Sequence, residues 1–332
     1  MNIVLAIPGH LKTVPMGGFC AEALRELGHR VTVVDFRSQW TDKVREKLAG
    51  KSDEEKVSIN RRIRCIVERT SPDAFITLFG FDISVQTLAW LRERKIPSAC
   101  WWINDPFQFE RSARKGGHYD FLFSNSAGSV DDYRAAGIAQ AHFLPTACQP
   151  AIHHGGPVRD AYRCDICFAG DWSPLRERMM LGLLDRFDLR IFGPWGKKLA
   201  ADSPLRARLT EGFFTPQEMT AMFNSAGIVL NLHTWYGKFE YGVNPRLFEA
   251  SACGAVQLVD RKREIPELFA VDREIFLYES LEDVAAAARD ILALPADSRR
   301  AVGDAALQRA HAEHSYRHRM ASLLATMGAA GA

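Results

Sequence analysis

The sequence KFEYGVNPRLFEASACGA, at residues Lys238–Ala255, describes a loop that leads into a short helix. Asn244 is a favoured N-cap residue and Pro245 a favoured first helical residue, so the helix begins directly after a glycine-containing loop. Short apolar runs lie on either side, at Ile228–Leu232 and Val256–Asp260, and are typical of buried strands. A strand, a helix and a second strand in this order predict part of a parallel sheet with crossover helices.

The same alternation of strand and helix extends over both halves of the chain. In the first half we expect strands at Asn2–Pro8, Arg30–Asp35, Ala74–Phe79, Ser98–Ile103, Asp120–Ser124 and His142–Leu144. The helices between them are expected at Gly17–Leu27, Asp53–Glu68, Ile83–Arg94 and Ala127–Ala136. In the second half, further strands are expected at Cys164–Ala169, Leu189–Phe192 and Ile275–Tyr278, and helices at Leu175–Arg186, Pro216–Asn224 and Ser280–Leu294.

This pattern predicts two Rossmann-like domains. Residues Ala151–Tyr162 are polar and rich in glycine and proline, which is typical of a linker. We therefore place one doubly wound parallel-sheet domain at residues 1–155 and a second at residues 156–308, with a central cleft between the carboxyl ends of their sheets. Residues 309–327 are expected to form a C-terminal helix that packs back toward the N-terminal domain, and residues 328–332 a disordered tail.

Composition excludes several classes of function. The net charge of the 332 residues is +2, which argues against binding nucleic acid through charge alone. No apolar run approaches the length of a membrane span, and the short apolar start lacks a basic leader. The seven cysteines are an odd number, and Cys164 and Cys167 lie three residues apart on a predicted strand, which orients them to opposite faces. We expect a cytoplasmic protein with free thiols, and no metal site.

The start of the helix after Asn244 is predicted to bind a diphosphate. Its free N–H groups and the positive end of its dipole form a site for anions. Arg246, in the first turn, adds a guanidinium group suited to phosphate oxygens. Glu249 lies one turn further on nearly the same face, where its carboxylate can accept hydrogen bonds from both hydroxyls of a ribose. The alternative is an ordinary capped helix with an Arg–Glu surface pair.

The order of these residues resembles the spore-maturation CgeB-like family of GT-B glycosyltransferases. The motif G-V-N-x-R-x-F-E-x-x-x-C-G-A of that family is similar to residues Gly242–Ala255. More loosely, the segment resembles the Glu-x7-Glu segment of retaining GT-B enzymes, in which Glu249 matches the ribose-binding carboxylate and Glu240 lies one position out of register. The resemblance implies the GT-B fold, with an N-terminal acceptor domain and a C-terminal nucleotide-sugar donor domain.

Other segments of the second half resemble the donor domain of the family. Residues Phe168–Arg176 are similar to the strand, loop and helix that open this domain, which implies that Gly170 and Arg176 approach the diphosphate. Residues Ile191–Trp195, with Gly193, resemble the next strand end. Residues Gly212–Phe214 and Pro216–Asn224 resemble the segment that contacts the nucleotide base, mostly through backbone groups. The motif loop itself adds Tyr241 and Gly242 to the predicted donor-binding residues.

The first half is expected to hold the acceptor and the catalytic base. His10 follows the first strand and resembles the base of many inverting GT-B enzymes, since an imidazole accepts a proton near neutral pH. Asp105 lies in an aromatic–Asp–Pro stretch similar to one in the CgeB-like family and is the second candidate base. The residues predicted to bind the acceptor are Gly17, Trp101, Trp102 and Asn104.

These features predict a glycosyltransferase that moves a sugar from a nucleotide-diphosphate sugar to an acceptor. Helix-dipole and guanidinium groups are expected to stabilise the leaving diphosphate, so that neither a metal nor a further cofactor is required. The alternatives are a non-catalytic nucleotide-sugar-binding protein and a GT-B-shaped nucleotide-sugar epimerase. Apart from the nucleotide sugar and its acceptor, the sequence indicates no partner and leaves the oligomeric state open.

Overall fold

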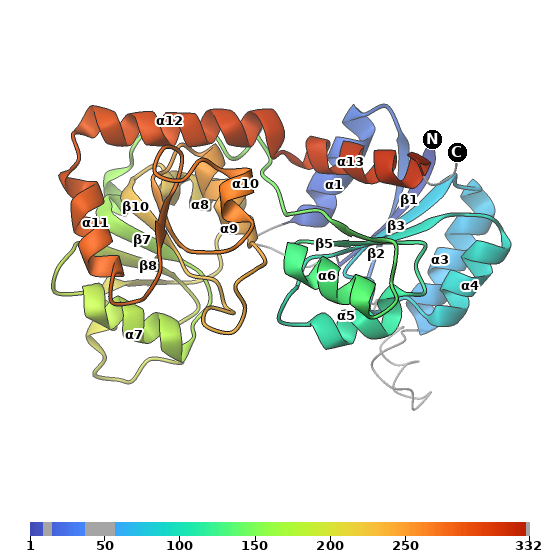
Figure 1. Cartoon of the computed structure of the whole chain (residues 1–332), viewed down its shortest axis with the longest axis horizontal. Coiled ribbons are helices and arrows are strands. Elements are labelled where there is room, and N and C mark those ends of the chain that lie inside the picture. The colour runs from blue at the N-terminus through green and yellow to red at the C-terminus, as the bar shows by residue number, and fades with distance from the viewer. Residues whose placement is uncertain (9–14, 37–56, 330–332) are drawn as a thin grey trace. The chain divides into compact units, whose positions relative to one another are not determined.

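The computed structural model describes residues 1–8, 15–36 and 57–329 (Figure 1). The chain forms two compact units. Of the described residues, the N-terminal unit contains those up to Thr146 and those from Tyr316 onward, and the C-terminal unit contains Ala147–Ser315.

The N-terminal unit is built on a six-stranded sheet in the order β2-β1-β3-β4-β5-β6, in which all neighbouring strands are parallel. The strands are β1 (Asn2–Ile7), β2 (Arg30–Asp35), β3 (Ala74–Leu78), β4 (Ser98–Trp102), β5 (Phe121–Ser124) and β6 (Ala141–Phe143). Its chain order reverses between β1 and β3, and ligands of open α/β sheets bind at such a switch point, beyond the carboxyl ends of the strands.

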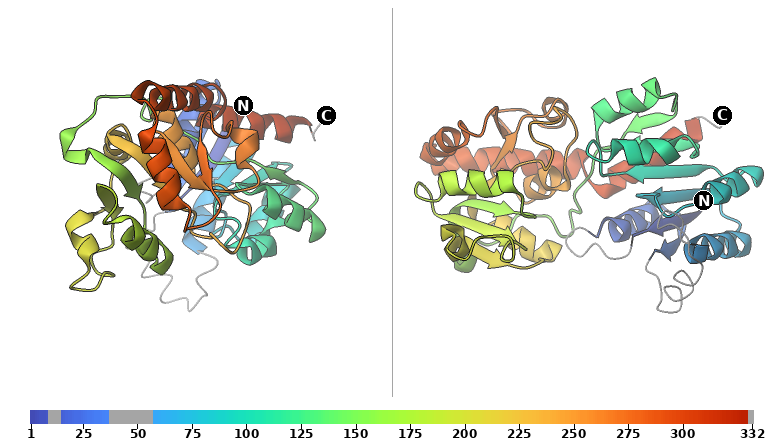
Figure 2. Two further views of the ribbon diagram at one scale, coloured as in Figure 1. Left: turned by 60° about the vertical axis from the view of Figure 1, so that its left-hand side comes forward. Right: turned by 90° about the horizontal axis from the view of Figure 1, so that it is seen from below.

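Helices cover both faces of this sheet (Figure 2). They are α1 (Met16–Glu26), α3 (Val57–Thr70), α4 (Val85–Glu93), α5 (Phe109–Gly116), α6 (Ala127–Ala135) and α13 (Tyr316–Ala329). The C-terminal helix α13 lies beside α1 (Figure 1), where the rings of Phe19 and Tyr316 are 5.2 Å apart. The C-terminal helix thus contributes to the core of the unit that contains the N-terminus.

The C-terminal unit contains a second six-stranded parallel sheet in the order β12-β11-β10-β7-β8-β9. Its strands are β7 (Cys164–Ala169), β8 (Leu189–Gly193), β9 (Leu209–Glu211), β10 (Ala226–Asn231), β11 (Gln257–Asp260) and β12 (Phe276–Tyr278). Counted from β7, this is the dinucleotide-binding order 3-2-1-4-5-6, and its switch point lies between β7 and β10.

The helices of this unit pack on both faces of its sheet. The core on one face includes Phe168, Leu230 and Leu258, and the core on the other includes Val229 and Val259. They are α7 (Pro174–Leu183), α8 (Pro216–Phe223), α9 (Pro245–Ala252), α10 (Ile265–Leu268), α11 (Val284–Ala293) and α12 (Ala296–Glu313). Short 3-10 helices lie at Asp160–Tyr162 and Pro204–Arg208. None of the helices in the described ranges is long and apolar enough to cross a membrane.

The unit boundaries differ from the predicted ones at 155 and 308. The glycine-rich segment before residue 156 belongs to the C-terminal unit, because its backbone is bound there: the Ile152 carbonyl accepts a hydrogen bond from Thr220 at 3.1 Å. The chain crosses instead at the buried residues Thr146 and Ala147. The predicted tail helix is divided at His314, whose ring bonds to the Leu268 carbonyl at 2.8 Å.

Candidate functional site

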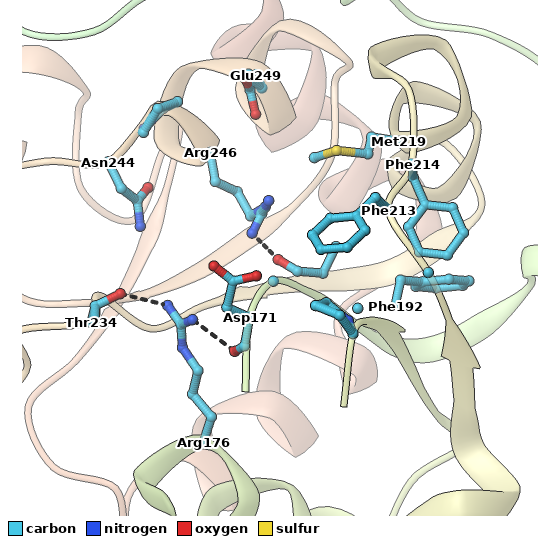
Figure 3. A pocket seen from close by; sticks show the side chains of 16 residues that line it. Asp171, Arg176, Phe192, Phe213, Phe214, Met219, Thr234, Asn244, Arg246 and Glu249 are labelled. Carbon is cyan, nitrogen blue, oxygen red and sulfur yellow. Dashed lines mark hydrogen bonds between the residues drawn. The ribbon is translucent and has the colours of Figure 1, made fainter. Parts of the chain in front are cut away.

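A pocket of about 280 Å³ lies in the C-terminal unit, at the carboxyl ends of its strands. Its lining comes from the residues that follow β7, β8, β9 and β10 and from the first turn of α9 (Figure 3). It therefore occupies the switch point of this sheet, where the fold leaves a crevice for a ligand. Six of the predicted donor-binding residues line it: Gly170, Arg176, Gly193, Asn244, Arg246 and Glu249.

Helix α9 begins in the wall of this pocket. Asn244 is its N-cap, and the Asn244 side-chain oxygen accepts a hydrogen bond from the Leu247 backbone N–H at 3.2 Å. Two amide hydrogen bonds to Asn231, at 2.8 and 3.1 Å, fix the orientation of this side chain. Pro245 occupies the first turn, as the sequence predicts. The remaining free N–H groups and the positive end of the helix dipole give the pocket an anion-binding end.

Two arginines meet at the same end of the pocket. A Cβ atom placed on Gly170 would lie 3.5 Å from an Nη1 atom of both Arg176 and Arg246, so the two guanidinium groups flank this glycine. Burial and the neighbouring Arg246 lower the pKa of Arg176 to about 10, which leaves it charged at neutral pH. Burial lowers the pKa of Arg246 as well. Two neighbouring cations, Arg176 buried and Arg246 partly buried, are complementary to an anionic ligand.

The two guanidinium groups differ in how many of their N–H groups are free. Arg176 donates to the carbonyls of Asp171 at 2.9 Å and Leu232 at 2.7 Å and to the Thr234 hydroxyl at 3.2 Å (Figure 3). These contacts tie the loop after β7 to the loop after β10. The Nε atoms of both arginines find no partner among the described residues. Arg246 differs in that only its Nη1 donates there, to the Ala169 carbonyl, whereas Arg176 donates through both Nη atoms. Arg246 is therefore the arginine that is freer to bind a phosphate.

Glu249 lies one turn along α9 and is only 2% exposed. Its Oε2 atom is buried without a hydrogen-bond partner among the described residues. Burial raises the pKa of Glu249 to about 7, although the charge of Arg246 acts in the opposite direction. A buried carboxylate without partners is costly, and native structures keep such groups chiefly where a ligand satisfies them.

Gly193 allows two strand ends to approach each other at the base of the pocket. A Cβ atom at this position would lie 2.2 Å from the Gly170 carbonyl oxygen, a contact with rigid backbone. The same carbonyl accepts a hydrogen bond from the Trp195 indole at 2.8 Å. Gly193 thus shapes the pocket through the backbone.

We expect Gly193→Ala to lower the free energy of unfolding by about 2 kcal/mol or more, because the backbone must shift to relieve the overlap. Chemical denaturation measures this change. The matched control is Gly182→Ala on α7, where a Cβ atom meets nothing within 4 Å. The control should stabilise the protein by about 0.5–1 kcal/mol, as alanine does in an exposed helix. Equal stability of both variants would contradict the close approach.

One side of the pocket is apolar. Phe192, Phe213, Phe214 and Met219 gather there, opposite the polar groups of Asn244 and Thr234 (Figure 3). Phe213 is 68% exposed, and Phe192 and Phe214 meet edge to face at 5.8 Å. The sequence analysis named the segments that contain Asp171, Phe192, Phe213, Phe214 and Met219 but did not single out these side chains. It missed Thr234, because nothing in its local sequence distinguishes it from a loop residue.

Tyr241 and Gly242 are absent from the lining of the pocket. The Tyr241 carbonyl accepts a hydrogen bond from the Trp235 indole at 2.9 Å. The Gly242 N–H donates to a Glu264 carboxylate oxygen at 2.8 Å, and its positive φ of 87° suits a glycine. The two residues shape the loop that leads to Asn244 instead of facing a ligand.

In the N-terminal unit, Asp105 is fully buried. Its Oδ2 accepts hydrogen bonds from Ser124 at 2.6 Å and Tyr133 at 2.8 Å, and its backbone is paired with the Asn125 amide. Burial raises the pKa of Asp105 to about 6. Asp105 thus joins the β4 and β5 loops, while its Oδ1 has no hydrogen-bond partner among the described residues. Its assignment as a base stays a prediction.

The predicted acceptor residues are also mainly structural. Trp101 and Trp102 are 0% and 2% exposed, and the Trp101 indole donates to the Leu144 carbonyl at 2.8 Å. Gly17 is buried, and a Cβ atom there would lie 2.7 Å from Ile7, so this glycine lets α1 pack on β1. Asn104 is partly exposed and bonds weakly to a side chain on its own loop. The tryptophans are therefore core residues and not stacking surfaces for a sugar.

His10, the other predicted base, lies outside the described residues. In the sequence it follows β1, which ends at Ile7. Its assignment stays a prediction.

Comparisons with known proteins agree with this geometry. Residues 176–325 match the family described as Glycosyl transferase-like. The matched residues include most of those that line the pocket. Spore protein CgeB of Bacillus subtilis (strain 168) is 23% identical over 208 residues, which cover 58% of this chain and 65% of that protein. The chain thus aligns with somewhat less than two thirds of the length of this curated relative.

Solved structures show the same fold. Sucrose-phosphate synthase from Thermosynechococcus elongatus superimposes with a TM-score of 0.71 at 13% identity, covering 99% of this chain and 100% of that one. Anabaena HepE in complex with UDP-glucose gives a TM-score of 0.69 at 12% identity, with the same coverage. The chain thus resembles spore protein CgeB over part of its length, and its fold is that of the GT-B glycosyltransferases.

Proposed function

We propose that this protein transfers a sugar from a nucleotide-diphosphate sugar to an acceptor, and that the pocket of the C-terminal unit binds the donor. The observation that carries the proposal is a pair of side chains one turn apart on α9. Glu249, whose Oε2 is buried without a hydrogen-bond partner among the described residues, and Arg246, of which only Nη1 donates a hydrogen bond there, line one pocket at a Rossmann switch point. Ribose hydroxyls and a diphosphate are complementary to these two groups.

The donor would lie across the pocket in a defined direction. The diphosphate binds at the start of α9, beside Arg246 and Gly170. The ribose donates to Glu249. The base lies against the apolar side formed by Phe213 and Phe214. As the bond between sugar and diphosphate breaks, negative charge develops on the leaving phosphate, and the helix dipole and Arg246 stabilise it without requiring a metal.

A thermal-shift screen against uridine, guanosine, adenosine, cytidine and thymidine diphosphates tests donor binding. We expect one of them to raise the melting temperature clearly above the effect of its nucleoside, since a ligand at 100 times its Kd adds about 2.7 kcal/mol to the free energy of unfolding. UDP is the first candidate, because the similar protein HepE was solved with UDP-glucose. A screen in which no diphosphate raises the melting temperature would contradict the proposal.

Incubation of the protein with the donor sugar that binds best separates the alternatives. A transferase hydrolyses the donor slowly and so releases the nucleoside diphosphate slowly; an added acceptor makes this release faster. A nucleotide-sugar-binding protein releases none, and an epimerase yields an altered nucleotide sugar without release.

A further inference from the structure

A chain of buried side chains leads from the end of β11 to the backbone at the start of α9. His233, which follows β10, is 0% exposed, and its Nδ1 lies 2.7 Å from the Oδ1 atom of Asp260. The other carboxylate oxygen of Asp260 lies 3.0 Å from the Nζ of Lys262, which is only 2% exposed. On the opposite edge of the imidazole, Nε2 accepts a hydrogen bond from the Asn244 backbone N–H at 3.2 Å.

These contacts fix the protonation of the imidazole. A backbone N–H can only donate, so the Nε2 atom of His233 must carry the lone pair that accepts the bond from Asn244. The proton of the neutral ring therefore lies on Nδ1, which donates a hydrogen bond to Asp260. The hydrogen bond at one ring nitrogen commonly determines which nitrogen of a histidine carries the proton. The ring therefore donates a hydrogen bond to a buried carboxylate and accepts one from a backbone amide.

The neighbouring residues hold the same loop. The Lys262 ammonium donates to the Phe239 carbonyl at 2.8 Å, and the Arg263 backbone N–H donates to the Glu240 carbonyl at 2.8 Å. Together with the bond from His233 to Asn244, these contacts join the end of β11 to the loop that enters α9. These contacts fix the orientation of the start of α9 through residues that do not line the pocket.

His233 does not line the pocket, and with no solvent exposure it cannot touch a ligand there. Burying Asp260 and Lys262 is expensive, and such groups persist where they specify one arrangement of the chain. The arrangement specified here is that of Asn244, the N-cap whose helix presents its free N–H groups to the pocket.

We infer that His233 is a positioning residue for the anion-binding end of the pocket: by holding the Asn244 amide, it orients the first turn of α9 toward the diphosphate of the ligand. The inference rests on the proposed function for the identity of the ligand. The inference assigns His233 an effect on the affinity for the diphosphate group and none on the affinity for the nucleoside.

Three variants separate the two edges of the ring. Glutamine places an amide oxygen near the position of Nε2 and retains the bond from Asn244, asparagine reaches only the Nδ1 position, and phenylalanine retains neither. We expect His233→Phe and His233→Asn to weaken UDP binding at least tenfold in calorimetry while uridine affinity, measured by NMR titration, changes less than twofold. The affinities of His233→Gln for UDP and for uridine should stay within about threefold of those of the wild type.

The outcomes distinguish this inference from the proposed function. A wild-type protein that binds none of the five nucleoside diphosphates of the screen contradicts both; where another diphosphate binds in place of UDP, that diphosphate and its nucleoside are the probes. A wild-type protein that binds UDP, with equal losses for UDP and uridine in His233→Phe or no rescue by glutamine, overturns the inference alone. Long-range ¹H–¹⁵N NMR spectra of the imidazole give an independent readout without ligand: we expect the Nδ1–H tautomer, and an Nε2–H tautomer would overturn the positioning link.

Discussion

Replacing Arg246 by alanine should reduce the affinity for UDP by roughly 100-fold and leave the affinity for uridine unchanged. The loss of two charge-assisted hydrogen bonds to phosphate is worth about 3 kcal/mol. The neighbouring Arg176 does not compensate, since its Nη atoms already donate to carbonyls of the β7 and β10 loops. Isothermal titration calorimetry with both ligands measures the difference.

Two further variants control this experiment. Arg246→Lys retains the charge without the planar fork, so its affinity for UDP should lie between those of the wild type and the alanine variant. Arg178→Ala removes an exposed arginine from helix α7 and should bind UDP like the wild type. If UDP affinity in Arg246→Ala stays within twofold of the wild type, the diphosphate does not bind at the start of α9.

The sequence was sufficient for most of the C-terminal unit, because its signals are local. The cap and first turn at Asn244 and Pro245 are determined by neighbouring residues, and the structure forms α9 from Pro245. Strand β7 has the predicted bounds, Cys164–Ala169. Strand β9, at Leu209–Glu211, was missed, because three residues at a sheet edge show no apolar periodicity.

The burial of candidate residues in the N-terminal unit has one physical origin. Asp105 and Trp101 follow or end a strand, where α/β folds commonly place functional residues, yet the structure buries both side chains. Burial depends on contacts with residues distant in the sequence, such as the bond from Tyr133 to Asp105, which local sequence does not reveal. The same limit explains why His233 and Asp260, 27 residues apart, were not associated.

The pH dependence of Glu249 is the second large effect. Burial raises the pKa of this carboxyl from 4.5 to about 7, so between these values the native state binds a proton that the unfolded state has lost. The resulting stabilisation is complete below pH 4.5 and is lost as the pH rises through 7. A difference of about 2.5 in pKa corresponds to about 3 kcal/mol.

Glu249→Gln removes this titration. Relative to the wild type, the variant should gain stability by about 2 kcal/mol between pH 5.5 and pH 8, as measured by urea unfolding at both values. A constant difference between the two proteins over this range would show that the carboxyl titrates normally.

Binding of the donor should depend on pH in the opposite direction. Ribose hydroxyls donate hydrogen bonds to the ionised carboxylate, so the wild type must release a proton to bind, and its affinity for UDP-glucose should rise roughly tenfold from pH 6 to pH 8. UDP-glucose is the suitable probe, because its diphosphate diester keeps its charge over this range. Glu249→Ala should bind about 2 kcal/mol more weakly at pH 8, through the loss of two hydrogen bonds to a charged group, and without any pH dependence. A wild-type affinity that does not change with pH would place the ribose elsewhere, whereas a tenfold rise that the alanine variant lacks would identify Glu249 as the group that binds it.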